Sequence, residues 1–374
     1  MLAVQWREGP EYPMGIQDSV CGVLGGKFVS AGGFTRHPKD ILKSYPDAFG
    51  GGPSGFTRLA FAFDPAHEDA GWARIADIPG PARQGAAGVE VGDSLYAIGG
   101  FSYSEPLSYR EGWRLTGPAL TWSPLPDLPW PVCEASAVAI GSRIYLLCAA
   151  DYFKAPGDAD ADFHSQLGRN GDPVGSALLM LDTEHLDAGW KRLADMPGVP
   201  KFDAAVAAVG GRVYVLGGIY SPTGKVGAGS YSDGAASYHY FNAVDSWVYD
   251  PPSDAWTRLP DMPDGANRRA LAVGDRTILL ISGYKYPQTW LLDGTRREAY
   301  DAEEKKLDWK AFFQTTVLAY DTQTGQLAPA APLLERTSWP GGAILGDTVF
   351  TVGGEGGRLW HPATFQIGKV AVRN

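Results

Sequence analysis

The sequence predicts an all-β fold of six repeated sheets that surround a common axis, and three observations predict it. A short apolar strand ending in a pair of small residues recurs every 49 to 71 residues along the 374-residue chain. Between these pairs, a strand that carries a tryptophan recurs and ends in a proline-rich turn. A strand of small residues and a turn that begins with glycine precede the apolar strand. One such sheet cannot bury both of its faces, so the copies must stack on their neighbours.

The clearest copy runs from residue 72 to residue 100. Its tryptophan strand occupies residues 72–79, its small-residue strand residues 84–91 and its apolar strand residues 94–100. The pairs that end the apolar strands are Gly32-Gly33, Gly99-Gly100, Cys148-Ala149, Gly217-Gly218, Ser282-Gly283 and Gly353-Gly354. The tryptophans of the outer strands are Trp72, Trp122, Trp190 and Trp256, and residues 326–329 hold the corresponding place in the fifth copy without one.

The sixth copy lacks its tryptophan strand at the C-terminal end of the chain. After Gly353-Gly354 one apolar stretch remains, residues 364–372, and no tryptophan strand follows it. Residues 4–7, which include Trp6 and precede a proline turn, resemble that missing strand. We therefore expect the N-terminal strand to pair with the C-terminal sheet, which removes an open sheet edge. Residues 1–374 are then expected to form a single domain.

The overall charge and the cysteines exclude some classes of protein. With 32 basic and 42 acidic residues the net charge is -10, which argues against nucleic acid as a partner. Cys21, Cys133 and Cys148 contain no CxxC pair, so we expect no disulfide framework. No apolar run is long enough to span a membrane. We expect a soluble protein, cytoplasmic if the numbered start is native and periplasmic or secreted if a signal peptide was removed.

The long insertions all fall between the second and third strands of a copy. They comprise residues 34–56, 150–175, 219–242 and 284–313. In a four-stranded sheet this joint opens on the same face as the connections between sheets, so the insertions should form a funnel around the axis. Loops of this length in a compact fold are usually functional. We therefore expect the binding site at this face.

Basic residues recur at the connections between the sheets, close to the expected mouth of the axial channel. Such a ring of cations predicts an anionic small ligand, because arginine matches a carboxylate in a bidentate fashion. The alternative is that these side chains tie adjacent sheets together through carbonyl or aspartate partners. The residues concerned are Arg83, Lys201, Arg268 and Arg336.

The segment that follows Gly353-Gly354 combines an acid, a cation and an aromatic residue. Glu355 could act as a general acid or base, Arg358 could orient a substrate carboxylate, and Trp360 could stack on a sugar. The alternative is a polar hairpin whose charges are solvated.

No cofactor or metal is expected. Residues 158–162 have the alternating aspartates of a calcium loop, but Phe163 stands where such a loop needs glycine and no glutamate closes it. A solvated acidic loop is the better interpretation. The six histidines show no close-pair spacing of metal ligands.

The order of strands and turns resembles the kelch repeat, whose units run to about 50 residues and form β-propellers. The third strands also end as kelch strands do, in pairs such as Tyr249-Asp250 and Tyr320-Asp321. Within kelch proteins, the chain is similar to the N-acetylneuraminate epimerase (sialic acid mutarotase) family. This resemblance rests on residues 311–321, on Glu355 with Arg358, and on the ending at residues 370–374.

The resemblance implies a six-bladed propeller that interconverts the anomers of a sialic-acid-like anionic sugar. It points to Glu355 and Arg358 as the functional residues. Our hypothesis is that Glu355 transfers the proton and that Arg358, with Arg83 or Arg268, holds the carboxylate. Two alternatives remain. A non-catalytic propeller would bind a glycan or a protein partner through the same funnel. A lyase or hydrolase would use a pair of carboxylates, for which Glu134 and Glu355 are the candidates.

Overall fold

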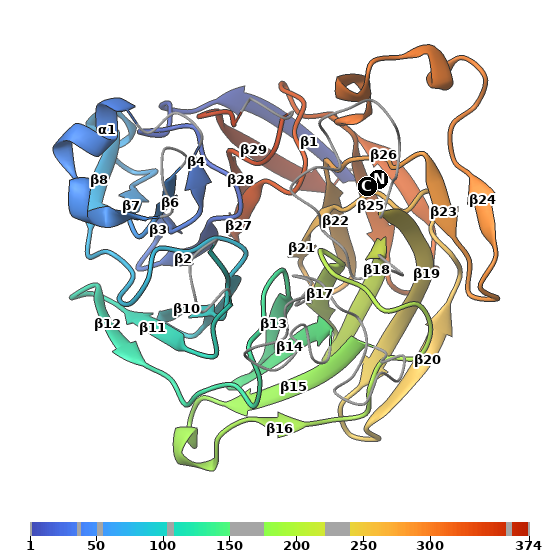
Figure 1. The fold of residues 1–374 in the computed structure, drawn as a ribbon, viewed down its shortest axis with the longest axis horizontal. Helices are drawn as coiled ribbons and strands as arrows, with labels where there is room; N and C mark the ends of the chain where they lie inside the picture. The colour runs from blue at the N-terminus through green and yellow to red at the C-terminus, as the bar shows by residue number, and fades with distance from the viewer. Residues whose placement is uncertain are drawn as a thin grey trace, which may run out of the picture.

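The computed structural model describes residues 2–35, 39–50, 55–102, 108–149, 176–220, 240–356 and 361–372. The regular structure of the described chain is mainly β-strand, in several four-stranded antiparallel sheets like those of a kelch propeller, as the repeats predict. Figure 1 shows the sheets arranged around a central axis.

The first three sheets follow the repeat directly, each with its strands in chain order. Sheet 1 consists of β2 (Val20–Leu24), β3 (Lys27–Ala31), β7 (Ala60–Phe63) and β8 (Trp72–Ile75). Sheet 2 consists of β9 (Ala87–Val91), β10 (Ser94–Ile98), β11 (Gly112–Thr116) and β12 (Thr121–Pro124). Sheet 3 consists of β13 (Ser136–Ile140), β14 (Arg143–Ala149), β15 (Ser176–Asp182) and β16 (Lys191–Arg192).

The other three sheets include one extension and one strand from the far end of the chain. Sheet 4 consists of β17 (Ala205–Val209), β18 (Arg212–Tyr220), β19 (Phe241–Asp250) and β20 (Ala255–Leu259), extended by β23 (Gln288–Trp290) and β24 (Arg296–Glu298). Sheet 5 consists of β21 (Arg269–Val273), β22 (Thr277–Ile281), β25 (Val317–Asp321) and β26 (Leu327–Ala330). Sheet 6 consists of β27 (Gly341–Leu345), β28 (Thr348–Val352), β29 (Phe365–Val372) and β1 (Leu2–Glu8).

The N-terminal strand lies where the tryptophan pattern of residues 4–7 predicts it. Strand β1 pairs with β29 over its whole length, from Leu2 opposite Val372 to Glu8 opposite Gln366. The innermost strands contact one another in a cycle, from β2 through β9, β13, β17, β21 and β27 back to β2. Their close approach depends on small residues. A Cβ atom added to Gly341 would lie 2.5 Å from the sulfur of Cys21 on β2.

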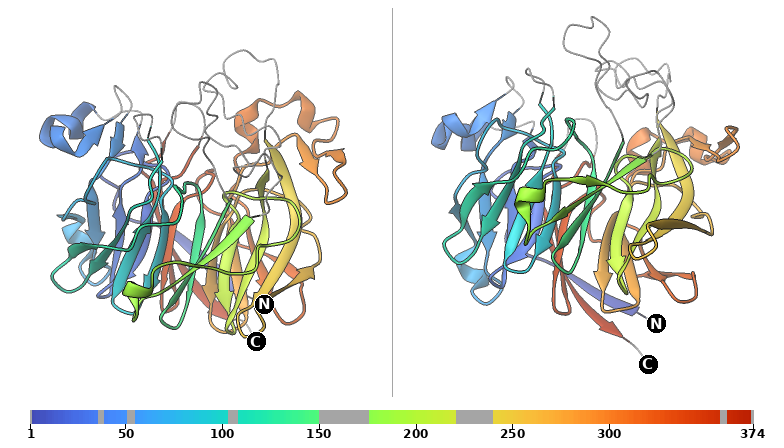
Figure 2. Two further views of the ribbon diagram at one scale, coloured as in Figure 1. Left: turned by 60° about the horizontal axis from the view of Figure 1, so that its bottom comes forward. Right: turned by 90° about the horizontal axis from the view of Figure 1, so that it is seen from below.

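The insertions carry the remaining elements. They are α1 (Lys39–Ser44), the short strands β4 (Phe34–Thr35), β5 (Phe49–Gly50) and β6 (Gly55–Thr57), and the 3-10 helices η1 (Pro46–Ala48), η4 (Glu304–Lys306) and η5 (Trp309–Phe312). Two further 3-10 turns, η2 (Glu68–Ala70) and η3 (Leu186–Ala188), precede outer strands. Figure 2 shows α1 and the segment with η4 and η5 on the side opposite the two chain termini.

The outer-strand tryptophans hold neighbouring sheets together. The Nε1–H of Trp72 donates to the carbonyl of Pro10 at 2.9 Å, in the chain that leaves sheet 6. Trp6 makes the corresponding bond to Ala331 at 2.9 Å, which gives the N-terminal strand the same role as the other outer strands. The remaining bonds of this type are Trp122 to Ala76, Trp190 to Pro126 and Trp256 to Ala194.

A phenylalanine in place of Trp72 tests this role of the ring nitrogen. Trp72→Phe keeps an aromatic ring against Phe63 and Phe365 but removes the donor to Pro10. We expect the free energy of unfolding to fall by about 1 to 2 kcal/mol, because a net hydrogen bond contributes about 1 kcal/mol and the ring is smaller. Urea denaturation measures the loss. An unchanged midpoint would show that the bond contributes nothing.

Sheet 5 lacks this tryptophan, and its insertion crosses to sheet 4 instead. Strand β23 pairs in parallel with β19, with Asn242 opposite Thr289. The buried Asn242 amide also donates to the carbonyls of Tyr286 and Gln288, at 2.8 and 3.0 Å, and its oxygen accepts from the N–H of Tyr286. The insertion at residues 284–313 therefore fastens the two sheets to each other.

Candidate functional site

The mouth of the axial channel is formed by one turn that recurs just before the innermost strands. In five of the sheets the same turn residue has a left-handed backbone, with φ between 44° and 62°. Backbone hydrogen bonds link neighbouring turns, because Glu134 N–H donates to Gly85 at 2.8 Å and Asp203 N–H donates to Glu134 at 3.1 Å. The five turn residues are Asp18, Gly85, Glu134, Asp203 and Trp339.

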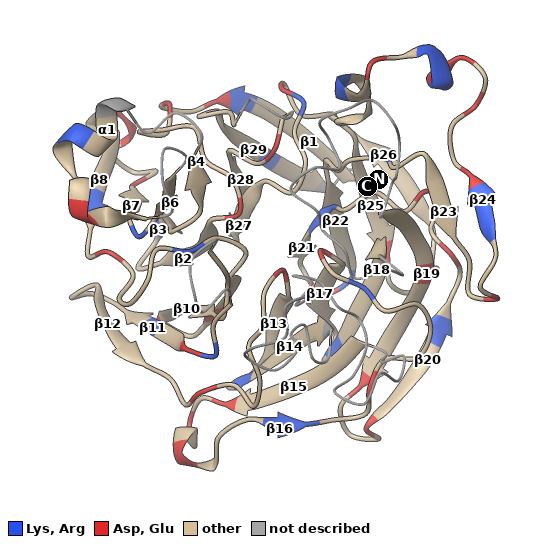
Figure 3. Ribbon diagram, in the orientation of Figure 1, with Lys and Arg blue, Asp and Glu red and all other residues tan. Residues whose placement is uncertain are grey.

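Four carboxyl groups meet at this mouth. Asp18, Glu134 and Asp203 come from turns of different sheets and line one crevice. Glu355 follows the glycine pair of sheet 6 and bridges Ser338, with backbone bonds of 2.8 and 2.9 Å. Figure 3 shows acidic positions, in red, beside β13, β17 and β27 at the central opening. The convergence of acids from three or more sheets is a property of the ring of sheets and of no single repeat.

The pKa values of three carboxyl groups at the mouth are raised, and burial is the main cause. Burial raises the pKa of Glu134 well above its ordinary value, and repulsion from Asp203, Asp18 and Glu355 adds to this. Burial likewise raises the pKa of Asp203 well above its ordinary value, with further repulsion from Asp18 and Glu355. Burial also raises the pKa of Asp18 to about 6. These shifts favour the protonated forms of the buried carboxyl groups, and a protonated carboxyl group is what general acid chemistry requires.

Arg269 is the cation that faces these acids. Its guanidinium lies over the Trp339 ring, 4.6 Å from the centroid, and its Nε–H donates to the carbonyl of Pro340 at 3.0 Å. Burial lowers the pKa of Arg269, while the negative charges of Asp203 and Asp18 oppose that shift. The attraction of Arg269 in turn lowers the pKa of Asp203, although burial outweighs it.

The cavity at the mouth continues into the axial channel. The crevice between the turns has a volume of about 10 Å³, enough for about one water molecule. Below it, a channel of about 230 Å³ is lined by small residues of the innermost strands, and Arg269, Ser19 and Trp339 border both spaces. The crevice itself is too small for a ligand much larger than water, so a larger ligand would contact these carboxyl groups from outside it.

Glu90 on β9 is an ionisable group inside this channel. Its carboxylate accepts a hydrogen bond of 2.6 Å from the N–H of Val23 on β2. Gly22 makes room for it, because an added Cβ would lie 2.9 Å from Cγ of Glu90. Burial raises the pKa of Glu90 from 4.5 to about 7, and the bond from Val23 opposes that shift only in part.

Glu90 should make the protein less stable as the pH rises. Its folded-state pKa exceeds its unfolded-state pKa, so the contribution of its neutral form is lost between about pH 4.5 and pH 7. We expect Glu90→Gln to raise the free energy of unfolding by up to about 3 kcal/mol at pH 8, with little gain at pH 5. Urea denaturation at the two pH values measures this. An equal gain at both would exclude ionisation as its cause.

Three of the predicted cations lie away from the mouth, buried in the seams between strands. Arg83 donates to Glu111 and to the carbonyl of Gly99, at 2.8 and 3.1 Å, and its guanidinium lies 4.3 Å from the Tyr109 ring centroid. Its exposed fraction is 2%. This arrangement agrees with the alternative to ligand binding, in which the cation links parts of the protein to each other.

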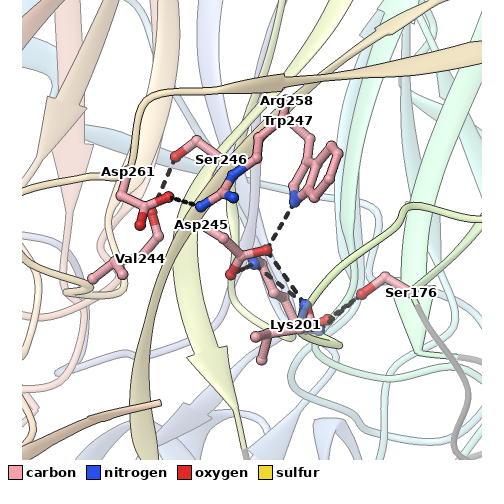
Figure 4. Close-up of polar contacts among 9 residues, drawn as sticks. Ser176, Lys201, Val244, Asp245, Ser246, Trp247, Arg258 and Asp261 are labelled. Carbon is pink, nitrogen blue, oxygen red and sulfur yellow. Dashed lines mark hydrogen bonds and ion pairs between the residues drawn. The ribbon is translucent and has the colours of Figure 1, made fainter. Parts of the chain in front are cut away.

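Lys201 and Arg268 are held in the same way. Lys201 pairs with Asp245 and donates to the carbonyl of Val199 at 3.3 Å (Figure 4). Arg268 pairs with Asp264 and donates to Gln314 at 3.0 Å. Arg336 is exposed. None of these four cations lines the crevice between the turns.

The other predicted site residues divide into two groups. Glu134 and Glu355 are both at the channel mouth, where each interacts with the other's charge. Arg358 and Trp360 lie outside the described residues, as does the acidic loop at 158–162. Among the residues that the structure describes, no three His, Cys, Asp or Glu side chains are arranged to hold a metal ion.

Four residues of the mouth were missed by the sequence analysis: Asp18, Asp203, Arg269 and Trp339. Aligning the copies on the turn before the small-residue strand, rather than on the glycine pair, would have placed the turn acids and Trp339 in one ring. Arg268 and Arg269 are neighbours, and the strand period of two directs only one of them to the axis.

Glu355 also stands out when the copies are compared. The residue after the small-residue pair is Phe34 in sheet 1, Phe101 in sheet 2, Ile219 in sheet 4 and Tyr284 in sheet 5. These four side chains are buried in one apolar cluster around the mouth. Sheet 6 has a carboxylate at that position, where the other four have apolar side chains.

No helix in the described ranges is long and apolar enough to cross a membrane. No family model matches the chain. The chain is 25% identical over 285 residues to Kelch-like protein terF of Aspergillus terreus, a match that covers 65% of this chain and 55% of that protein. It is 34% identical over 150 residues to N-acetylneuraminate epimerase of Yersinia enterocolitica, covering 40% of this chain and 32% of that protein.

A third match extends further along both chains than the match to the Yersinia protein. An N-acetylneuraminate epimerase of Escherichia coli is 29% identical over 200 residues, which is 49% of each chain. The matched segments thus span from about one third to just over half of the length of these relatives. Together with the four-stranded sheets, the matches support a kelch-repeat protein that resembles the N-acetylneuraminate epimerases.

Proposed function

We propose that the chain is a single-domain, six-bladed kelch propeller, closed by the pairing of β1 with β29, that interconverts the anomers of a sugar at its channel mouth. The observation that carries the proposal is the convergence of four carboxyl groups and Arg269 at one opening. The names of the epimerases that the chain resembles support the same reaction.

The reaction needs one base and one acid on opposite oxygens of the sugar. Glu355 removes the proton of the anomeric hydroxyl, and Glu134 or Asp203 donates a proton to the ring oxygen. The bond between the anomeric carbon and the ring oxygen then breaks, which leaves an open-chain carbonyl. Reclosure on the other face of that carbonyl returns both protons and yields the other anomer.

The raised pKa values suit these roles. Burial and mutual repulsion raise the pKa of Glu134 and of Asp203, which favours the protonated forms that an acid needs. A protonated carboxyl group can donate to a ring oxygen, which a carboxylate cannot do. No metal or cofactor is needed for this proton exchange.

We propose an anionic, sialic-acid-like sugar as the substrate, with its carboxylate on Arg269. This residue takes the role that the sequence analysis gave to Arg83 or Arg268, since those side chains are paired within the protein. Arg358 remains a proposed second contact to the carboxylate, and Trp360 a proposed contact to the ring.

Exchange between anomers of N-acetylneuraminate tests the proposal. Saturation-transfer NMR measures the exchange rate with and without the protein, at a pH where the spontaneous rate is low. We expect faster exchange in proportion to protein concentration. An unchanged rate would refute the mutarotase function, and line broadening of the sugar without faster exchange would favour the non-catalytic glycan-binding propeller.

A further inference from the structure

Trp339 is a large aromatic residue in a turn that does not require one. Its φ of 45° lies in the left-handed region, where a bulky side chain is disfavoured. The same turn carries Asp18, Glu134 or Asp203 in other sheets, with φ between 44° and 52°. The turn accepts a small polar residue in other sheets. Backbone strain at a tryptophan in this position therefore indicates a function for that residue.

Packing in the core does not explain this tryptophan. The ring is only partly buried, and within the described ranges it belongs to none of the apolar clusters between the sheets. It borders the crevice that Asp18, Glu134 and Asp203 line, and also the channel below. The indole is therefore presented to the place where the proposed substrate lies.

Arg269 holds the indole in place. The guanidinium lies 4.6 Å from the ring centroid and is itself anchored by its bond of 3.0 Å to the carbonyl of Pro340. Since Pro340 follows Trp339 directly, this contact ties the ring to its own turn. A ring fixed in this way loses little conformational freedom when a ligand packs against it.

We propose that Trp339 is the stacking platform of the sugar site, against which the apolar C–H face of a pyranose ring packs. The hydroxyl groups at the edge of the ring then face the carboxyl groups of the mouth, and Arg269 is within reach of a substrate carboxylate. This inference rests on the proposed function and adds the residue that orients the ring.

The substitution Trp339→Asn separates a binding role from a structural one. Asparagine tolerates the left-handed backbone better than tryptophan does, so we expect the melting temperature to be unchanged or higher. We expect the KM for anomer exchange of N-acetylneuraminate to rise at least tenfold, with a smaller change in kcat. Trp339→Phe should keep most of the affinity. A lower melting temperature with unchanged KM would assign Trp339 to the scaffold and overturn the inference.

Trp122→Phe is the matched control, because this tryptophan bonds to the carbonyl of Ala76 at the outer rim. It should lower the melting temperature and leave KM unchanged. A readout that does not depend on catalysis uses protein labelled with 5-fluorotryptophan. The fluorine signal that disappears in Trp339→Asn belongs to Trp339, and it should shift when N-acetylneuraminate is added.

The two hypotheses fail in different ways. A shift of the Trp339 signal without faster anomer exchange would refute the catalytic function and retain the stacking platform. Faster exchange with no shift of that signal and an unchanged KM in Trp339→Asn would refute the platform and retain the catalysis.

Discussion

Replacing Glu355 by glutamine is expected to slow the anomer exchange catalysed by the protein about 100-fold or more. General acid–base catalysis by one positioned side chain typically contributes a factor of about 10² to 10⁴. Glutamine keeps the shape of the side chain but cannot accept the anomeric proton. Saturation-transfer NMR on wild type and Glu355→Gln measures the ratio of the rates.

The same variant should change the titration of the remaining acids. The negative charge of Glu355 raises the pKa of Glu134 and of Asp203, so its removal should lower both. Any residual activity should then be lost at a lower pH, because Glu134 and Asp203 lose their protons at a lower pH. Glu303→Gln, on the exposed 3-10 segment, is the control and should keep wild-type rates. A fully active Glu355→Gln would remove Glu355 from the mechanism.

Replacing Lys201 by methionine is expected to lower the free energy of unfolding by about 3 to 5 kcal/mol. The Lys201 side chain is fully buried against Asp245, which is itself 2% exposed. Methionine would leave this buried carboxylate with the Trp247 Nε1–H, at 2.8 Å, and the N–H of Val199, at 3.3 Å, but without a compensating charge. Figure 4 shows Lys201, Asp245 and Trp247 together.

Denaturation by urea measures the loss, and two variants make the result specific. Lys306→Met, at a lysine that is 67% exposed, should change stability by less than about 0.5 kcal/mol. The double variant Lys201→Met with Asp245→Leu should recover part of the loss, because it removes the uncompensated charge along with its partner. If Lys201→Met alone were as stable as wild type, the pair would not hold the seam between the sheets.

The repeat pattern predicts most of the fold because its signals are local. Glycine pairs, strand periodicity and the tryptophan strands each report on a few consecutive residues. They place strands correctly and assign Trp6 to the last sheet, where it bonds to Ala331. The insertion that carries β23 could not be assigned in this way, since its pairing with Asn242 depends on how two copies meet in space.

The site was predicted less completely, and for a physical reason. Glu134 and Glu355 were predicted as candidate carboxylates, and both are at the channel mouth. The sequence identifies the basic residues, but it does not show which of them form ion pairs in the folded protein. The carboxylates that pair with Arg83, Lys201 and Arg268 lie 28, 44 and 4 residues away along the chain.

The sequence by itself determined the repeated β-sheet architecture and the place of the insertions between the second and third strands of a sheet, because both follow from short-range patterns. Only the tertiary structure decided which residues meet at the axis. Asp18, Glu134, Asp203 and Trp339 occupy one turn position in separate sheets and become neighbours only when the sheets stand in a ring. The raised pKa values of Glu134 and Asp203 arise from burial and from that proximity, which no single repeat contains.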